Sequence, residues 1–595
     1  MIPTRTFDIL DRSLRLFHGK NALAEKEGAH WTFYTVEQYH DLAHLFACGL
    51  MSMGLRQGDK IVTITNNRPQ WNIVDMGMAM AGVVHVPVYT SMNNEEYRHI
   101  IAHSDASMVI LSGQKLLETL APLVQASKRV KHLYTFDGLD GVPFWMEIVQ
   151  KGEEAGPVCM ERLKELKASI KPGDLASIIY TSGTTGISKG VMLSHENLVR
   201  NALAATTIFQ MTPEDRYLSI IPVCHVGGRM GNYQTQLSGS CIYYAESMGT
   251  IAANLKEIRA TGFDAVPRIL EKIFDNVMAR GRTLKGMKKR LFFWAVRIGM
   301  RYRHPEQMGW LYRRQLKLAD RLIFSKWREA LGGKARLVGC GGASLQPRLE
   351  RIFWASGLKI INMYGLTETS PIITINRQEG SLLRLGTVGC AIDGVEVRIA
   401  PDGEILCRGH NVMLGYYKDK DDQLTREVID PDGWLHTGDL GHLDQQGFLS
   451  VTDRKKEIFK LSSGKYIAPQ VLENRLKESP FIDQVMVVGE NQKFTSALIL
   501  PDFKYLREWC LSNSLDIEDD RGILVCHPEV MAAYNREVTG INKSFSAWEK
   551  ISRLRLVTDE WSPGTGELSA SLKLKRKVLE AKYQPLLEDI YQRQS

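Results

Sequence analysis

The sequence predicts an α/β protein: a large N-terminal domain of helix-covered β-sheets, followed by a small C-terminal α+β domain. In the first third of the chain, helical and strand patterns alternate, which is typical of parallel sheets covered by helices. From Asp393 onward, short strands separated by turn pairs such as Asp402-Gly403 indicate a more antiparallel region. After Arg454, helix and strand patterns form a separate compact segment. These three observations define the predicted architecture.

Local signals define elements of the large domain. Apolar residues at helical spacing predict a helix over residues 7–17. Thr35 and Gln38 fit a capping box that starts a second helix, which runs toward Gly54. The sequences GDKIVTI and ASMVILS are typical of short buried strands. The apolar run 76–89 is interrupted by His85 and too short to cross a bilayer, so it predicts a buried helix and strand.

The second half of the chain carries its own strand patterns. VEVRIA, GEILCRG and GFLSVTD predict short strands in the antiparallel region. Beyond it we expect a helix near 468–477, then the strands QVMVVGE and SALILPD, another helix and a charged tail. We place the domain boundary near residues 453–457, which gives domains at 1–453 and 454–595.

Composition excludes several classes of protein. A chain of 595 residues with 44% hydrophobic and 24% charged residues is a folded, enzyme-sized body, neither a small stapled module nor a disordered protein. Its nine cysteines are scattered without a CxxC pair, so neither a disulfide framework nor a zinc site has the required spacing. The N-terminus lacks the continuous apolar stretch of a signal peptide. We therefore expect a cytoplasmic protein that does not span a membrane.

Positive charge is concentrated in one segment. Residues 280–328 contain fifteen Lys or Arg and only two acids, Glu306 and Asp320, whereas the whole chain has a net charge of +8. Apolar residues at helical spacing between 287 and 302 predict a basic amphipathic helix. A solvated basic face over a core stripe and a contact with anionic membrane or a phosphate-rich ligand remain as alternatives. We expect no nucleic acid, because no binding motif accompanies the charge.

The strongest chemical signal is a strand that opens into a loop of hydroxyls and glycines at residues 178–190, IIYTSGTTGISKG. Glycines let backbone N–H groups approach a polyphosphate, hydroxyls donate to it, and Lys189 supplies charge. The loop is not a Walker A motif, because Gly190 stands where Ser or Thr should follow the lysine. Alone, such a loop is more often a surface turn than a nucleotide site.

Further motifs follow in order along the chain. They are Gly341-Gly342-Ala343, Tyr364-Gly365-Leu366-Thr367-Glu368, Trp434-Leu435-His436-Thr437-Gly438-Asp439, Asp453-Arg454-Lys455-Lys456 and Ser571-Leu572-Lys573-Leu574-Lys575-Arg576. With the 178–190 loop, this series resembles the adenylate-forming superfamily of acyl-CoA synthetases, luciferases and peptide-synthetase adenylation domains. The resemblance covers about residues 35–576 and implies a small β-barrel-like subdomain and a mobile C-terminal domain.

Within that superfamily the chain looks most like the long-chain fatty acid–CoA ligases. HVGGRM at His225, AVPRILEKI at Ala265 and LKLKRK near the end carry this similarity. Two features depart from the subgroup's pattern. Gly227 and Gly228 replace a bulkier pair, and Leu270 stands where many members have a tryptophan proposed to gate the acyl tunnel.

The resemblance implies a site residue by residue. Adenine would lie against the Gly341-Gly342-Ala343 turn, with the Tyr364 ring stacked on it beside Gly365; Asp439 and Arg454 would hold the ribose. Glu368 would bind Mg²⁺, a hard cation suited to a carboxylate. Thr367 would donate to the α-phosphate. The β- and γ-phosphates would be surrounded by Thr181, Ser182, Gly183, Thr184, Thr185, Gly186 and Lys189. Lys573 would bridge the substrate carboxylate and the α-phosphate.

The same resemblance implies a second step with a thiol. The C-terminal domain would swing about the hinge residue Lys456, and Gly464 would form part of a channel for coenzyme A (CoA). His225 would change rotamer between the two states and, with Val226, Gly227 and Arg229, border the acyl pocket. Taken singly, each residue also has a structural explanation, and only their joint order favours function.

The sequence therefore predicts a ligase that converts a long-chain fatty acid, ATP and CoA into acyl-CoA, AMP and pyrophosphate through an acyl-adenylate. One alternative is a fatty acyl-AMP ligase that loads an acyl carrier protein. A luciferase-like oxygenase shares the first step, and a non-catalytic acyl or nucleotide sensor could use the same fold. Peripheral contact with the inner face of an anionic membrane and a homodimer are further partner hypotheses.

Overall fold

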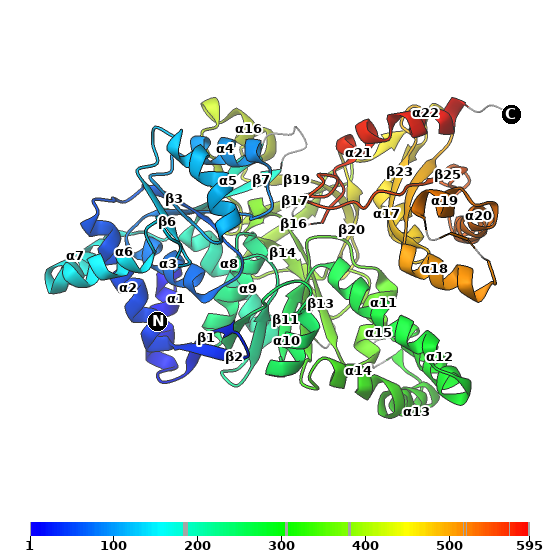
Figure 1. The fold of residues 1–595 in the computed structure, drawn as a ribbon, viewed down its shortest axis with the longest axis horizontal. Coiled ribbons are helices and arrows are strands. Elements are labelled where there is room, and N and C mark those ends of the chain that lie inside the picture. The colour runs from blue at the N-terminus through cyan, green and yellow to red at the C-terminus, as the bar shows by residue number, and fades with distance from the viewer. Residues whose placement is uncertain are drawn as a thin grey trace. The chain divides into compact units, whose positions relative to one another are not determined.

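The computed structural model describes residues 2–182, 188–303, 307–378, 382–515, 517–518, 520–569 and 572–592 (Figure 1). The chain divides into two compact units. The larger unit comprises Met1–Arg398, Leu406–His436 and Gln445–Leu449. The smaller unit comprises Ile399–Ile405, Thr437–Asp444 and Ser450–Ser595.

A nine-stranded sheet forms one half of the large unit, in the order β15-β14-β13-β12-β11-β9-β10-β1-β2. The neighbouring strands from β13 to β1 run parallel, while β2, β14 and β15 are antiparallel additions at the two edges. Its strands are β1 (Asn21–Glu27), β2 (His30–Thr35), β9 (Arg216–Ser219), β10 (Cys241–Tyr244), β11 (Gly262–Ala265), β12 (Leu337–Cys340), β13 (Lys359–Gly365), β14 (Ile372–Ile375) and β15 (Cys390–Ala391).

A seven-stranded sheet forms the other half, in the order β18-β8-β7-β4-β3-β5-β6. Strands β7, β4, β3, β5 and β6 are parallel neighbours, whereas β7 and β8 form an antiparallel hairpin to which β18 adds. The strands are β3 (Lys60–Ile64), β4 (Val84–Val88), β5 (Met108–Leu111), β6 (His132–Thr135), β7 (Leu175–Ser182), β8 (Ser188–Ser194) and β18 (Gly415–Tyr416).

Helices cover both sheets, and the central ones lie between them. Buried side chains of α1, α2, α3, α8 and α9 share one core cluster with strands of both sheets. All residues of α3 are buried, including the polar residues Gln70, Asn72 and Asp75. The helices of the large unit are α1 (Thr6–Leu16), α2 (Val36–Ser52), α3 (Pro69–Met80), α4 (Asn94–His103), α5 (Gln114–Gln125), α6 (Met146–Glu154), α7 (Gly156–Ser169), α8 (His195–Phe209), α9 (Val226–Leu237), α10 (Ile251–Ile258), α11 (Pro267–Thr283), α12 (Gly286–Met300), α13 (Trp310–Ala319), η2 (Asp320–Phe324), α14 (Ser325–Ala330), α15 (Pro347–Ala355), η3 (Thr367–Thr369), η5 (Lys420–Asp422) and α16 (Gln423–Val428).

A four-stranded sheet has the order β16-β17-β19-β20, and the division between the units passes through its strands. These strands are β16 (Val395–Ile399), β17 (Glu404–Gly409), β19 (Leu435–Leu443) and β20 (Leu449–Arg454). The turn between β16 and β17 is closed by a hydrogen bond from Gly403 N–H to Ala400 O, and Gly403 has a φ of +88°, which glycine adopts without strain.

The rest of the small unit has a core of its own, drawn from residues between Leu461 and Ile590. Its three-stranded sheet pairs β23 with β24 antiparallel and β24 with β25 parallel. Its elements are β21 (Phe459–Lys460), β22 (Tyr466–Ile467), α17 (Pro469–Leu476), β23 (Ile482–Val488), β24 (Ser496–Pro501), α18 (Phe503–Ser512), α19 (Arg521–Cys526), α20 (Pro528–Asn542), β25 (Arg553–Leu556), α21 (Arg576–Lys582) and α22 (Gln584–Gln592).

The predicted fold class is confirmed: helix-covered sheets dominate the large unit, and helices and a small sheet form the C-terminal part. The capping box at the start of α2 is present, with Gln38 N–H donating to Thr35 Oγ1 and Thr35 N–H donating to Gln38 Oε1. The run 76–89 forms the end of α3 and strand β4. Among the described residues, no helix is both long and apolar enough to cross a bilayer. The boundary at residue 453 stays a prediction.

Candidate functional site

Many of the predicted site residues follow the carboxyl ends of parallel strands. His225 comes after β9, Gly341 after β12, and Glu368 after β13. Strands β9, β11, β12 and β13 are consecutive parallel neighbours, so their carboxyl ends lie along one edge of the sheet. Ligands of open α/β sheets bind outside this edge. The topology therefore gathers residues that are far apart in the sequence.

Asn67 links the corresponding edge of the other sheet to the loop before His225. It follows β3, and its side-chain amide donates to Ile221 O over 2.8 Å while its oxygen accepts from Val223 N–H over 2.9 Å. His225 is the N-cap of α9, and its Nδ1 accepts from Gly227 N–H over 3.0 Å. The histidine ring is therefore held at the start of a buried helix.

Two glycines of the sequence motifs, Gly228 and Gly365, lie in close packing. A Cβ on Gly228 would lie 2.4 Å from Pro222 O, and a Cβ on Gly365 would lie 1.7 Å from Pro371 O. Neither backbone can accept a side chain. The close approach of α9 to the preceding loop thus accounts for Gly228, whereas a Cβ on Gly227 would meet only the His225 ring, at 3.1 Å.

The Gly341-Gly342-Ala343 turn lies at the end of β12, beside the end of β13. Gly342 has a φ of +83°, and a Cβ on Gly341 would approach Met363 Cγ at 3.0 Å. Gly342 and Ala343 are exposed, whereas Tyr364 on β13 is half-buried. Exposed backbone next to an aromatic ring suits a flat heterocycle, as the sequence predicts for adenine.

The motif that the sequence predicts to bind phosphate lies on the β7–β8 hairpin. Thr181 and Lys189 are opposite one another in its register, and Ser182 ends β7. Gly183, Thr184, Thr185 and Gly186 lie outside the described residues. The hairpin places the lysine at the strand end that follows the loop.

Lys189 and Glu368 are brought together by Tyr416, which the sequence did not single out. The Nζ atom of Lys189 lies 4.9 Å from the centroid of the Tyr416 ring, and the hydroxyl of Tyr416 donates to Glu368 Oε1 over 3.0 Å. Backbone bonds support this contact, because Tyr416 pairs with Val191 on β8 and Met413 N–H donates to Glu368 O over 2.9 Å. A cation, a phenol and a carboxylate thus form one continuous group.

The protonation state of Tyr416 favours its hydrogen bond to Glu368. Burial, together with the adjacent Glu368 carboxylate, raises the pKa of Tyr416 far above its usual value. The phenol therefore stays protonated at neutral pH and donates its hydrogen. Glu368 is half-buried. A carboxylate that is hydrogen-bonded to Tyr416, whose ring Lys189 also contacts, fits a hard divalent cation such as Mg²⁺.

Thr367 adjoins Glu368 in η3 and is half-buried. The following residue but one, Thr369, anchors the turn, since Leu366 N–H donates to its Oγ1 over 2.8 Å. Asn201 on α8 fixes the next strand by accepting from Ile372 N–H and donating to Ile372 O. The backbone that carries Thr367 and Glu368 is therefore held from both sides.

In the small unit, the structure brings Asp439 and Arg454 together. Asp439 on β19 is 5% exposed, and Arg454 Nε lies 3.4 Å from its Oδ1. Asp439 N–H also donates to Thr437 Oγ1. The buried carboxylate can accept hydrogen bonds from vicinal hydroxyls, and the guanidinium beside it can donate to them. The pair therefore suits the ribose contacts that the sequence predicts.

Lys456 lies in an exposed turn directly after β20. Its neighbours are anchored: Lys455 Nζ contacts Asp402 and Glu404 at 2.6 and 2.9 Å, and Glu457 accepts from Arg576. Gly464 is in the turn between β21 and β22, with a φ of +84°, and a Cβ there would touch only Lys460 Cε at 3.9 Å. An open glycine turn leaves room for a ligand.

Lys573 lies in the segment just before α21. Its N–H donates to Ser569 Oγ and its carbonyl accepts from Ser569 N–H, and the side chain is half-buried. Arg576 anchors this segment through Glu473, at 2.6 Å, and Glu457, at 3.2 Å. The charged network on Arg576 therefore joins the segment of Lys573 to the residue that follows the predicted hinge.

Arg229, expected near an acyl pocket, belongs to a buried ion-pair network. It is 1% exposed and pairs with Asp75 on α3, which also accepts from His85 Nδ1 and the Tyr233 hydroxyl, each over 2.6 Å. Burial opposes the charge on Asp75, but Arg229 and the other donors lower its pKa below the usual value. The network ties α9, which His225 caps, to α3 and β4.

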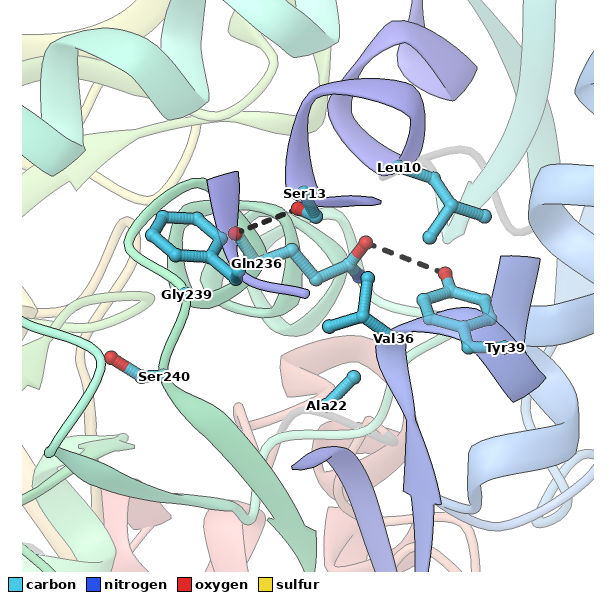
Figure 2. A pocket seen from close by; sticks show the side chains of 9 residues that line it. Leu10, Ser13, Ala22, Val36, Tyr39, Gln236, Gly239 and Ser240 are labelled. Atoms are coloured by element: carbon cyan, nitrogen blue, oxygen red, sulfur yellow. Dashed lines mark hydrogen bonds between the residues drawn. The ribbon is translucent and has the colours of Figure 1, made fainter. Parts of the chain in front are cut away.

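Two other features lie apart from these residues. Figure 2 shows a small pocket in which Gln236 reaches between Ser13 and Tyr39, and no predicted site residue lines it. Among the described residues, Asp11, His40 and His44 have ligand atoms within 4.8 Å of one another. Lys167 Nζ donates to Asp11 and His44 at 3.1 and 3.0 Å, so an ammonium already balances this cluster.

Comparison with known protein families shows the class to which this protein belongs. The sequence model of the AMP-binding enzyme family matches residues 10–417, and that of the AMP-binding enzyme C-terminal domain matches residues 456–595. The chain belongs to the AMP-binding enzyme family. This result confirms the resemblance seen in the motifs.

Two similar sequences and one similar solved structure illustrate this membership. The long-chain-fatty-acid–CoA ligase FadD15 of Mycobacterium bovis is 32% identical over 581 residues, covering 95% of this chain and 93% of its own. The long-chain-fatty-acid–CoA ligase ACSBG2 of Xenopus laevis is 28% identical and covers 99% and 84%. The adenylation domain of a carboxylic acid reductase from Segniliparus rugosus, solved with AMP and a co-purified carboxylic acid, has a TM-score of 0.74, covers 99% and 94%, and is 21% identical. That structure shows the shared fold.

Proposed function

We propose that this protein is a long-chain fatty acid–CoA ligase, which uses ATP to form a fatty acyl-adenylate and transfers the acyl group to CoA. The observation that carries the proposal is the group of Lys189, Tyr416 and Glu368, which joins the phosphate-binding hairpin to a carboxylate at the carboxyl edge of the other sheet. The relatives named as long-chain-fatty-acid–CoA ligases support the choice of substrate.

In the first step, the fatty acid carboxylate attacks the α-phosphate and pyrophosphate leaves. Two anions must approach each other, so the main tasks are to offset charge and to align the reactants. Lys189, with the hydroxyls of Thr181 and the residues that follow it, would bind the β- and γ-phosphates. Thr367 would donate to the α-phosphate, and Lys573 would bridge the two reacting groups.

The residues present fit a magnesium ion, because Glu368 is a hard oxygen ligand adjacent to the phosphate-binding hairpin. When bound, Mg²⁺ would supply positive charge to the phosphate oxygens. Tyr416 holds the carboxylate of Glu368 by its hydroxyl, so the ligand is oriented before substrates arrive. Asp439 and Arg454 would bind the ribose, and the Gly341-Gly342-Ala343 turn with Tyr364 the adenine.

In the second step, the thiol of CoA attacks the acyl carbonyl, the bond to AMP breaks, and a thioester forms. Lys573 must leave the reacting centre before the thiol enters. We assign this change to rotation at Lys456, where an exposed turn lies between anchored neighbours. Gly464 would line the thiol channel, and His225 would adjust its rotamer at the acyl pocket.

Pyrophosphate release tests the proposal across acids from acetate to long-chain and aromatic substrates, with and without CoA. We expect release to be highest with a long-chain fatty acid and a thioester to form with free CoA. A product formed only with an acyl carrier protein would favour the acyl-AMP ligase instead. Nucleotide binding without any turnover would favour a sensor. Both outcomes would reject the proposed reaction.

We place the protein in the cytoplasm, with peripheral contact to the inner face of an anionic membrane where its substrate partitions. The basic segment 280–328 supports this contact by its charge. A homodimer is a separate hypothesis that the mass of the protein in solution tests.

A further inference from the structure

Helix α13 has two apolar faces, of which the protein covers one. The covered face consists of Tyr312, Leu316 and Ala319, which recur at helical spacing. Ala319 is fully buried, and the Tyr312 hydroxyl donates to Ile298 O on α12 over 2.8 Å. Figure 1 shows α12 and α13 next to each other at the edge of the large unit. This contact fixes which side of α13 faces outward.

The outward side of α13 carries large apolar groups. Trp310 is 64% exposed, Leu311 59% and Leu318 48%. With Arg314 they occupy positions i, i+1, i+4 and i+8, which at 100° per residue fall within one face of the helix. Isolated apolar residues on a surface need no explanation, but a stripe on one exposed helix face does.

Cations accompany this stripe, and acids are absent from the helix sequence. α13 reads WLYRRQLKLA, and Lys317 lies beside the stripe on the exposed side. The guanidinium of Arg314 lies 5.0 Å from the Trp310 ring centroid. The adjacent α12 also has no acidic residue, and its first turn exposes Met287, Lys288 and Lys289.

We propose that the outer face of α13, with the first turn of α12, docks on the surface of an anionic lipid bilayer. Trp310, Leu311 and Leu318 would insert at the boundary of headgroups and acyl chains, and the cations would pair with lipid phosphates. A tryptophan suits this boundary, because its ring is apolar and its N–H is polar. The occupant follows from charge complementarity.

A second copy of this chain is a poorer partner for the same face. Self-association through a two-fold axis would bring equal patches together. The lysines and arginines of α12 and α13 would then face their own copies without acids between them, which is electrostatically unfavourable. An anionic bilayer offers negative charge and apolar depth at once.

Docking gives the proposed ligase access to fatty acids that partition into membranes, and in this respect the inference rests on the proposed function. The binding itself requires no catalysis. Vesicle binding and turnover with a dispersed substrate therefore report on separate claims.

The test measures sedimentation of the full-length protein with vesicles of phosphatidylcholine alone or with about 30% phosphatidylglycerol. One variant combines Trp310→Ser, Leu311→Ser and Leu318→Ser, and its control combines Val158→Ser, Met248→Ser and Leu511→Ser, which are exposed elsewhere. A second variant combines Lys288→Gln, Lys289→Gln and Lys317→Gln. Its control removes the same charge from the exposed Lys128, Lys131 and Lys151.

We expect both α13 variants to lose at least tenfold in affinity for anionic vesicles, and each control to stay within about twofold of the wild type. Wild-type binding should fall in phosphatidylcholine and in high salt. Equal binding by variants and wild type would overturn the proposal. The proposal would also be overturned if the wild type bound no vesicles but formed a dimer that the serine variant dissociates.

Turnover with a detergent-dispersed fatty acid, without vesicles, separates docking from catalysis. We expect the α13 variants to keep wild-type kcat within about twofold there, because neither helix supplies a residue to the proposed site. Loss of vesicle binding with intact turnover supports docking. A wild type that binds anionic vesicles but has no ligase activity would reject the proposed function and leave docking supported. A wild type with ligase activity that does not bind anionic vesicles would reject docking alone.

Discussion

Replacement of Tyr416 by phenylalanine isolates one contact of the candidate site. The change removes the hydroxyl that donates to Glu368 Oε1 over 3.0 Å and keeps the ring that Lys189 approaches at 4.9 Å. Tyr416 is 8% exposed, so the phenyl ring keeps its packing. We expect the variant to fold normally and to stabilise the transition state for adenylation less well.

The size of the loss follows from the charge on the acceptor. A hydrogen bond to an ionised group contributes about 1.5–3 kcal/mol. Since about 1.4 kcal/mol is a factor of ten in rate, kcat/KM for pyrophosphate formation should fall about 10- to 150-fold. If the hydroxyl acts by orienting a metal ligand, the Mg²⁺ concentration that gives half-maximal rate should rise as well.

Tyr417→Phe is the matched control, because the neighbouring hydroxyl donates to Asp105 Oδ2 at 3.3 Å and not to Glu368. We expect at most a twofold effect there. In a double-mutant cycle, Tyr416→Phe added to Glu368→Gln should cost little more than Glu368→Gln alone. An unchanged kcat/KM and Mg²⁺ midpoint in Tyr416→Phe, measured by pyrophosphate release, would refute the role of this contact.

Three further predictions address other residues. Lys573→Ala should lower the rate of adenylation by at least about 100-fold and leave the rate of thioester formation from supplied acyl-adenylate unchanged. Equal loss of both half-reactions would refute the role assigned to Lys573. Lys456→Pro should retain acyl-adenylate formation and stop before the thiol step in single-turnover assays, and normal overall turnover would contradict the hinge. Burial raises the pKa of Glu350 to about 8. Because the folded state keeps this proton while the unfolded state releases it, the free energy of unfolding should fall as pH rises from about 4.5 to about 8, by up to about 1.4 kcal/mol per pH unit. Denaturant titrations should show that Glu350→Gln lacks this part of the pH dependence. A pH profile identical to that of the wild type would contradict the prediction.

The sequence predicts the fold class well, because local patterns suffice for it. The alternation of helix and strand signals, the capping box at Thr35 and the buried run 76–89 all correspond to observed elements. Sheet order could not be predicted, since it depends on which strands pair across long stretches of chain. The pairing of β1 with β10 places residues near 23 beside residues near 242, and no local pattern indicates it.

The sequence suggests candidate site residues where their order along the chain carries the signal, and their roles stay predictions. Lys189, Glu368, Asp439 and Arg454 stand in motifs that the family resemblance identifies. Tyr416 was missed, because a single tyrosine before Tyr417 has no motif of its own and gains its role only when β18 joins β8.

The buried partners of Arg229 were missed for a related reason. Asp75 is the one charged residue of helix α3, and this is the signal that could have drawn attention to it. Its partner lies 154 positions away, so only the folded chain shows that the two charges offset each other.

A single-turnover reaction with a radiolabelled long-chain fatty acid tests the central claim most directly. With ATP, Mg²⁺ and no CoA, we expect about one equivalent of enzyme-bound acyl-adenylate and pyrophosphate. Adding CoA should convert that intermediate into acyl-CoA and free AMP. No acyl-adenylate, or an acyl-adenylate that CoA does not consume, would contradict the account.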